Sequence, residues 1–137
     1  MRFITNRSSG KQGYEIANSL VKNGFDTTLI SGPTNLKPND NLKLITVTPG
    51  EEMHKKTMEL LPCDLAIFTA AVSDFKIKKF NKEKIKKDKD QSFDLDLNPD
   101  ILELVSKSNK KPKIVVGFAA ESENLFDNAR SKLEKKG

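Results

Sequence analysis

The stretch that decides the fold is Leu65-Ala66-Ile67-Phe68-Thr69-Ala70-Ala71-Val72, which lies between Pro62 and the polar pair Ser73-Asp74. It is an almost continuous apolar run. A strand that is apolar at successive positions is covered on both faces, which is typical of a parallel sheet packed between helices. The run therefore predicts a central strand in the middle of a sheet.

Apolar runs and amphipathic stretches alternate along the rest of the chain, which is the pattern of parallel strands joined by crossover helices. Further strands are predicted at residues 25–31, 42–47, 93–97 and 113–119. Helices are predicted between residues 13 and 24, between 49 and 62, from 98 onward, and between 124 and 136. The sequence thus indicates an α/β fold with a mostly parallel sheet flanked by helices.

The composition is that of one globular domain. With 137 residues, of which 36% are apolar and 31% charged, the chain is long enough for a single core and too apolar for a disordered protein. No apolar run reaches the length of a bilayer span, and residues 1–6 lack the apolar stretch of a secretion signal. Cys63 stands alone, which excludes an internal disulfide and a cysteine-based metal cluster. These features predict a cytoplasmic location without a membrane partner.

Positive charge is concentrated in one segment. The whole chain has a net charge of +5, and residues 76–89 hold eight lysines against only Glu83 and Asp88. A basic patch confined to one segment indicates a local anionic ligand such as a phosphate group, whereas nucleic-acid-binding proteins more often spread positive charge over a face. The alternative is a solvated, lysine-rich surface loop, which composition alone favours.

Ligands of open α/β sheets collect at the carboxyl ends of the strands. Three segments are expected at that edge: residues 71–74 after the central strand, residues 98–100 at a helix start, and residues 117–121 after the next strand. The backbone N–H groups of Asp100 and Ile101 have the chemistry to hold phosphate oxygens, although the same residues also serve as an ordinary helix start.

Residues 6–13 form a polar loop that runs into the first predicted helix, and the function of this loop stays open. A Walker-type phosphate loop needs glycine where the chain has Thr5 and serine or threonine where it has Gln12, so this site is excluded. The glycine fingerprint of dinucleotide-binding proteins is also absent.

Other candidate residues are less informative. Lys132 shares a helix face with Lys136 and falls on the apolar stripe, so it either has a function or snorkels to water. His54 and Cys63 lack a third member for nucleophilic catalysis and are interpreted as structural. No acidic cluster has metal-ligand spacing, so no metal site is predicted, and a divalent cation would arrive with nucleotide phosphates.

Five sequence strings give the chain a specific resemblance. They are Ile4-Thr5-Asn6-Arg7-Ser8-Ser9-Gly10-Lys11-Gln12-Gly13, Ala70-Ala71-Val72-Ser73-Asp74-Phe75, Lys84-Ile85-Lys86-Lys87, Leu97-Asn98-Pro99-Asp100-Ile101-Leu102 and Val116-Gly117-Phe118-Ala119-Ala120-Glu121. In their order and spacing the chain resembles the phosphopantothenoylcysteine synthetases over nearly its whole length, in the bacterial form often fused behind a flavin-dependent decarboxylase. The resemblance implies a Rossmann-like, three-layer fold.

The resemblance also implies an activity. It is the ligation of 4'-phosphopantothenate to L-cysteine through an acyl-cytidylate, with use of CTP and release of CMP and pyrophosphate, in coenzyme A biosynthesis. Because charge develops on oxygen in both steps, positioned donors and cations are the expected catalytic devices. The implied catalytic residues are Asn6, whose amide would donate to an acyl oxygen, and Lys84, which would neutralise phosphate charge.

The nucleotide-binding set implied by the resemblance comes from all the expected rim segments. Its members are Phe68, Thr69, Ala70, Asp74, Lys84, Pro99, Asp100, Ile101, Leu102, Phe118, Lys132 and Lys136. The implied cofactors are CTP, as a substrate, and Mg²⁺, with FMN only if a decarboxylase domain is fused. The implied partners are the three small-molecule substrates, a second copy in a homodimer and a fused flavoprotein decarboxylase, but neither nucleic acid nor membrane.

The chain departs from the family at both ends. The family normally has a strand and a glycine-containing loop before the segment that appears here as Arg2-Phe3-Ile4, and it continues beyond Gly137. Residues 1–137 are therefore expected to form a single, partial ligase domain. Three alternatives stay open: a nucleotide-binding fragment or degenerate relative without ligase activity, a nicotinamide- or flavin-dependent reductase, and a nucleic-acid-binding protein that uses the lysine run.

Overall fold

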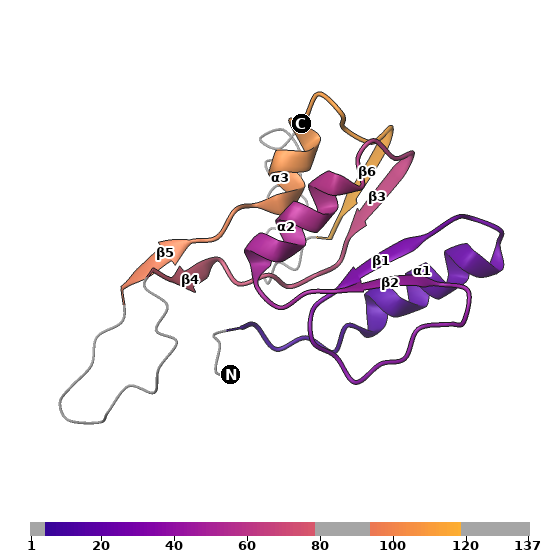
Figure 1. Cartoon of the computed structure of the whole chain (residues 1–137), viewed down its shortest axis with the longest axis horizontal. Helices are drawn as coiled ribbons and strands as arrows, with labels where there is room; N and C mark the ends of the chain where they lie inside the picture. The colour runs from indigo at the N-terminus through magenta and orange to yellow at the C-terminus, as the bar shows by residue number, and fades with distance from the viewer. Residues whose placement is uncertain (1–4, 79–93, 119–137) are drawn as a thin grey trace, which may run out of the picture.

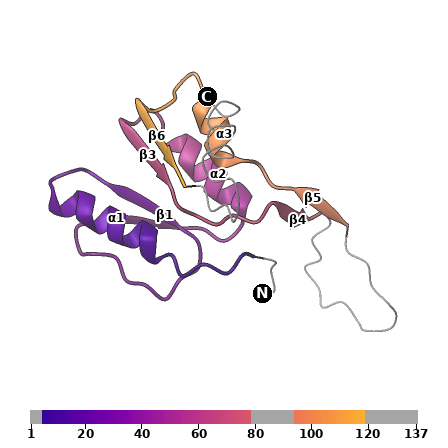
Figure 2. The same ribbon diagram turned by 180° about the vertical axis from the view of Figure 1, so that it is seen from behind.

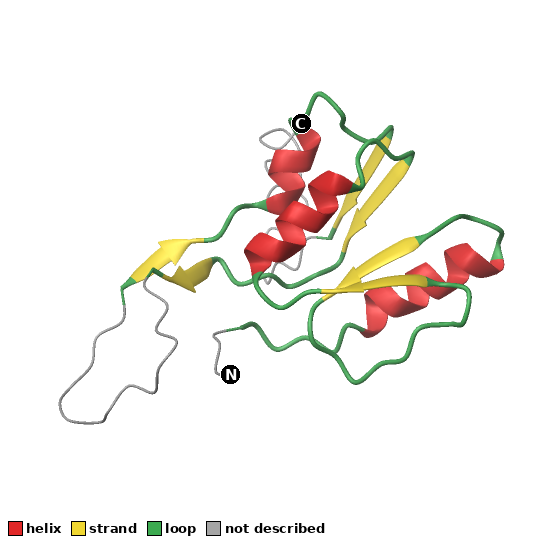
Figure 3. Cartoon of the chain, viewed as in Figure 1, coloured by secondary structure: helices red, strands yellow, loops and turns green. Residues whose placement is uncertain are grey.

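The computed structural model describes residues 5–78 and 94–118 of the chain. The elements in chain order are α1 (Lys11–Lys22), β1 (Thr28–Ser31), β2 (Lys43–Thr46), α2 (Gly50–Glu59), β3 (Leu65–Phe68), β4 (Phe75–Ile77), β5 (Leu95–Leu97), α3 (Ile101–Ser106) and β6 (Ile114–Gly117). The mixed α/β class with parallel sheets flanked by helices is confirmed (Figure 3). The helix predicted between residues 124 and 136 lies outside the described residues.

The described strands form three two-stranded sheets. β1 pairs with β2 in parallel, β3 pairs with β6 in parallel, and β4 pairs with β5 antiparallel. The strand predicted over residues 65–72 ends at Phe68, and within the described residues it pairs on one side only. The prediction of a mid-sheet strand therefore stays a prediction, because apolar composition reports coverage of the faces and says nothing about the edges.

Helices α2 and α3 lie together against the β3–β6 sheet, whereas α1 lies against the β1–β2 pair (Figures 1 and 2). The core between α2, α3 and β3 contains Leu61, Ile101 and Val105, of which Val105 is fully buried. Helix α2 also contacts β1, so it bridges the two parallel sheets.

Helix α1 buries one stripe and leaves the other to solvent. Tyr14 and Ala17, one helical turn apart, are buried. The helix ends at Lys22, and Gly24 follows with a φ of 85°, the left-handed conformation that glycine adopts most readily. The predicted glycine stop is confirmed.

Helix α3 begins two residues later than the sequence indicates. Asn98 was the expected cap and Pro99 the expected first helical residue, but the capping side chain is Asp100, which accepts a hydrogen bond from the Glu103 N–H at 3.0 Å. The Asn98 side chain does not cap the helix, because its amide donates hydrogen bonds to the carbonyl oxygens of Ser73 and Phe75 beside the neighbouring hairpin. Strand β4, which was not predicted, is the partner of β5 in that hairpin.

None of the helices in the described ranges is both long and apolar enough to cross a membrane.

We predict that Val105→Ala lowers the free energy of unfolding by about 2 kcal/mol, because it removes buried methyl groups and leaves a cavity. The adjacent Leu104 is 41% exposed, so Leu104→Ala should change this free energy by no more than about 0.5 kcal/mol. Urea titrations of both variants check the contrast. Equal losses would place the core elsewhere than between α2, α3 and β3.

Candidate functional site

A cleft of about 490 Å³ runs along the described part of the molecule and has two regions. The first, which we call the carboxyl rim, consists of residues 69–74, 98–102 and Phe118. The second, which we call the slot, lies between β1 and β3 and is lined by residues 28–30 and 65–68. Helix α2 contributes Met53 and Thr57 to the wall of the cleft.

The carboxyl rim gathers most of the residues predicted to bind a ligand. The predicted residues that line the cleft are Phe68, Thr69, Ala70, Asp74, Pro99, Asp100, Ile101, Leu102 and Phe118. They come from four places in the chain that meet because β3 and β6 are parallel and end at the same edge. Lys84, Lys132 and Lys136 lie outside the described residues, so their predicted roles stay predictions.

Asn6, the predicted catalytic amide, stands beside this rim. Its side-chain Nδ2 donates a hydrogen bond to the Val72 carbonyl oxygen at 3.3 Å, and Val72 itself lines the cleft. The N-terminal segment therefore passes the end of β3. The catalytic role assigned to Asn6 remains a prediction.

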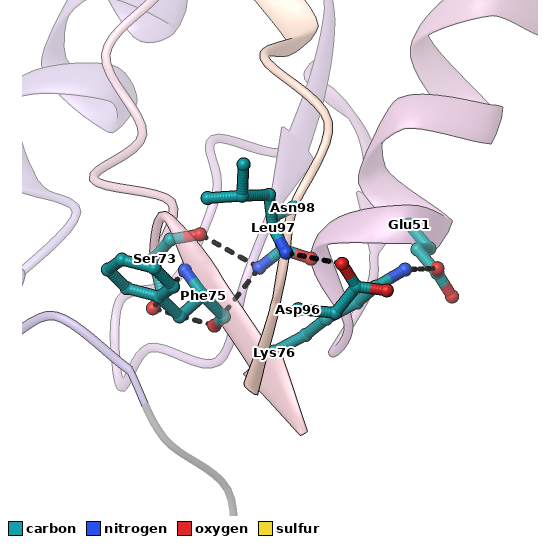
Figure 4. A network of polar contacts seen from close by, with 7 residues as sticks. All are labelled: Glu51, Ser73, Phe75, Lys76, Asp96, Leu97 and Asn98. Atoms are coloured by element: carbon teal, nitrogen blue, oxygen red, sulfur yellow. Dashed lines mark hydrogen bonds and ion pairs between the residues drawn. The ribbon is translucent and has the colours of Figure 1, made fainter. Parts of the chain in front are cut away.

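Asn98 fixes the geometry of the rim (Figure 4). Its Nδ2 donates to the carbonyl oxygens of Ser73 at 2.8 Å and Phe75 at 3.4 Å, while its backbone N–H donates to the Asp74 carbonyl oxygen at 2.8 Å. One side chain thus joins the segment after β3 to the segment before α3. Sequence reasoning identified Asn98 only as a helix start and missed this role, because the bonds span 23 to 25 positions along the chain.

A second connection ties the hairpin to α2. The Lys76 ammonium donates to the Glu51 carboxylate in the first turn of that helix, and this hydrogen bond raises the pKa of Lys76 (Figure 4). Lys76 belongs to the lysine-rich segment that was expected to meet an anion. In the structure its charge is already paired with a carboxylate, so the first lysine of that segment has a structural partner.

Close backbone packing brings α1 to the end of β3. A Cβ atom added at Gly13 would lie 2.7 Å from the Thr69 hydroxyl oxygen, closer than Cβ contacts are found. A Cβ added at Gly50 would lie 3.1 Å from a Val72 methyl carbon. Small residues at both helix starts therefore let α1 and α2 approach the residues of the rim.

The electrostatic character of the described cleft is weakly acidic. Asp74 and Asp100 are its charged lining residues among those described, and the rest are apolar, hydroxyl-bearing or amide side chains. Cys63 lines the far end, where partial burial raises the pKa of its thiol and makes it a poor nucleophile at neutral pH. Within residues 5–78 and 94–118, no three His, Cys, Asp or Glu side chains stand close enough to hold a metal ion.

Comparison with known proteins places the chain in a family. Residues 1–137 match the family described as the DNA/pantothenate metabolism flavoprotein C-terminal domain. The chain belongs to this family. Its similarity to solved structures includes the C-terminal domain of the coenzyme A biosynthesis bifunctional protein CoaBC, with a TM-score of 0.83, 34% identity, and coverage of 99% of this chain and 64% of that one.

The similar curated proteins of the family are longer than this chain. The coenzyme A biosynthesis bifunctional protein CoaBC of Haemophilus influenzae is 40% identical over 138 residues, which cover 99% of this chain and 34% of that protein. A protein from an unknown prokaryotic organism, named cysteine/cysteine sulfinic acid decarboxylase, is 36% identical, with 99% and 39% covered. The chain thus spans about a third of the length of these relatives, the first of which is bifunctional.

The comparisons correct the activity expected from the sequence. The family is described as a flavoprotein domain, one relative is named a decarboxylase, and none of these names describes a CTP-dependent ligase. The assignment to phosphopantothenoylcysteine synthetase, with ligation through an acyl-cytidylate, is therefore withdrawn. The alternative of a nucleotide-binding fragment without ligase activity is withdrawn with it. The role in coenzyme A biosynthesis stays a prediction, which the names of the CoaBC relatives support.

The expected cofactors are corrected on the same finding. CTP and Mg²⁺ were placed first and FMN was made conditional on a fused domain, whereas the family is named for a flavin. The described lining offers the phosphate of a flavin no cation, since Asp74 and Asp100 are its charged residues among those described. No chemical step is therefore derived through that group.

Proposed function

We propose that the carboxyl rim binds a phosphorylated pantothenate derivative, such as 4'-phosphopantothenate, as one domain of a bifunctional enzyme of coenzyme A biosynthesis. The observation that carries the proposal is the convergence on one cleft of nine residues that the sequence predicted to bind a nucleotide. The family description and the CoaBC relatives supply the substrate class.

The chemistry of the rim suits the pantothenate moiety. That moiety carries hydroxyl and amide groups beside a branched apolar carbon, and the rim offers Thr69, Asp74 and Asn98 next to Phe118 and Leu102. Mixed polar and apolar lining is the usual character of small-molecule sites. Hydrogen bonds to the polar groups would orient the ligand, and the apolar residues would exclude water from it.

The phosphate requires a cation, which the described lining does not provide. Strand β4 leaves the rim and leads into the lysine-rich segment, whose described members are Lys76 and Lys78. We assign phosphate neutralisation to the further lysines of residues 76–89, with Lys84 as the predicted contact. The roles predicted for Asn6, Lys132 and Lys136 belong to the same proposal.

The β4–β5 hairpin has an exposed apolar face that suits the homodimer implied by the resemblance. On the hairpin, Phe75 lies opposite Leu97 and Ile77 opposite Leu95, so all four share one face, and each is at least 36% exposed. A two-stranded hairpin alone is marginally stable in water, and an exposed apolar face of this kind marks an interface. A second copy would offer the same face across a two-fold axis.

The cytoplasmic location also remains a prediction.

We predict that Phe118→Ala weakens binding of 4'-phosphopantothenate at least roughly tenfold, because a ligand-covered aromatic ring contributes about 1.5 kcal/mol or more. Isothermal titration calorimetry measures the change. The matched control is Ile114→Ala at the other end of β6, where the side chain is 58% exposed, against 53% for Phe118, and does not line the cleft. Equal affinities of the two variants would remove Phe118 from the site.

The same calorimetric titration is repeated with pantothenate and with FMN as ligands. Pantothenate lacks the phosphate and should bind more weakly than 4'-phosphopantothenate. The difference in affinity between the two ligands should shrink as the salt concentration is raised. Tighter binding of FMN than of 4'-phosphopantothenate would contradict the proposed ligand class.

We predict that the domain alone releases no CO₂ from 4'-phosphopantothenoylcysteine in the presence of added FMN, because the chain spans about a third of the length of the bifunctional CoaBC relatives and the flavin chemistry is expected in the remaining part. Mass spectrometry of all products and a CO₂ assay check this outcome. The positive control is a full-length CoaBC protein. Release of CO₂ by the domain at a comparable rate would show that the flavin chemistry takes place here.

We predict that Leu97→Lys shifts the molecular mass in solution from that of a dimer to that of a monomer, because it places a charge in the apolar face of the hairpin. Light scattering after size-exclusion chromatography measures the mass. The control is Leu104→Lys on α3, which should remain dimeric. A monomeric unsubstituted protein, or a Leu97→Lys variant that stays dimeric, contradicts this interface.

A further inference from the structure

We propose that Asn98 is a positioning residue, which holds Asn6 at the carboxyl rim through the backbone of residues 72–75. The inference rests on the proposed function, in which the amide of Asn6 contacts the ligand. Asn98 acts without donating to the ligand, because it fixes the carbonyl group to which Asn6 is bonded. Loss of Asn98 therefore weakens ligand binding only as far as Asn6 contributes to it.

Two asparagine side chains hold neighbouring carbonyl groups of the segment that follows β3. The Asn6 Nδ2 donates to the Val72 carbonyl oxygen at 3.3 Å, and the Asn98 Nδ2 donates to the Ser73 carbonyl oxygen at 2.8 Å. Each carbonyl belongs to a planar peptide group, and the two groups share only the Cα atom of Ser73. A rotation of the second peptide group therefore displaces the first, and with it the acceptor of Asn6.

Asn98 also bonds to the next two carbonyl groups of this segment. Its backbone N–H donates to the Asp74 carbonyl oxygen at 2.8 Å, and its Nδ2 donates to the Phe75 carbonyl oxygen at 3.4 Å (Figure 4). Three successive carbonyl groups thus accept from one residue. The conformation of the backbone between the rim and β4 consequently depends on Asn98.

The start of α2 supports the same two points. A Cβ atom added at Gly50 would lie 3.6 Å from both the Cγ and the Nδ2 of Asn98, and 3.1 Å from a Val72 methyl carbon. The Asn98 amide is therefore enclosed between the backbone of α2 and the carbonyl groups that it bonds. Asn6, in contrast, is exposed, and among the described residues its side chain has the Val72 carbonyl as its hydrogen-bond partner.

The two amides differ in what they still have to offer a ligand. A primary amide carries two N–H donors. The Asn98 amide donates to two carbonyl oxygens, whereas the Asn6 amide donates to one. Asn6 thus keeps an N–H for a ligand, and Asn98 does not. This division assigns contact with the ligand to Asn6 and its support to Asn98.

A double-mutant cycle tests the dependence of Asn98 on Asn6. The affinity for 4'-phosphopantothenate is measured by calorimetry for the 137-residue protein, Asn98→Ala, Asn6→Ala and the double variant. We expect Asn98→Ala to weaken binding about tenfold when Asn6 is present, and about twofold or less when Asn6 is replaced. Direct contact of Asn98 with the ligand, or a general loosening of the fold, would give equal losses in both backgrounds.

The matched control is Asn23→Ala. The Asn23 Nδ2 also donates to a backbone carbonyl oxygen, that of Ser19 at 2.8 Å, but Asn23 stands at the end of α1 and does not line the cleft. This variant should bind the ligand like the unsubstituted protein. Asn98→Leu keeps most of the side-chain volume beside Gly50 and removes both donors, so it should match Asn98→Ala. Urea titrations identify the variants that fold.

A second measurement needs no ligand. Nitrogen-15 relaxation reports the order parameter of the Asn6 side-chain amide, which we expect to fall from above to below about 0.6 in Asn98→Leu and to stay unchanged in Asn23→Ala. An unchanged order parameter in Asn98→Leu, or equal losses of affinity with and without Asn6, would overturn the inference. If the unsubstituted protein does not bind 4'-phosphopantothenate, the proposed function fails, and the order parameter of Asn6 alone decides the role of Asn98.

Discussion

Backbone pairing at the edges of β3 is the constraint on which the rest of this structure depends. On one side, the parallel register with β6 brings Phe68 level with Gly117, so that both strands end at one edge. The loops that leave those ends, residues 69–74 and Phe118, are held together there. On the other side, the edge faces β1 across the slot. The cleft therefore owes its two regions to the two edges of one strand.

The rim is stabilised mainly by main-chain acceptors and two amide side chains. Asn98 bonds to the carbonyl oxygens of Ser73 and Phe75, and Asn6 bonds to that of Val72. Net hydrogen bonds of this kind contribute about 1 kcal/mol each, but they set positions that packing alone would leave free. The described side chains that line the rim are thus placed before a ligand arrives, which lowers the entropic cost of binding.

The sequence predicted the elements better than their pairing. Periodicity and glycine placement located α1, and apolar runs located β3 and β6, because these signals are local. The hairpin strand β4 was missed since Phe75-Lys76-Ile77 is too short to show a pattern. The strand partners of β3 could not be predicted either, because they are chosen by residues far away in the chain. At the site, the rim segments were predicted from the rule on strand ends, while the bonds of Asn98 required three-dimensional coordinates.

The family membership changes what the cleft is expected to do, and it leaves the geometry in place. The central claim is that β1 and β3 flank an open slot and do not pair with each other. Backbone nuclear Overhauser effects of the 137-residue protein test it most directly. The account predicts cross-strand effects between β1 and β2 and between β3 and β6, and none between β1 and β3. Sequential backbone effects that link residues 28–30 to residues 65–68 would contradict it.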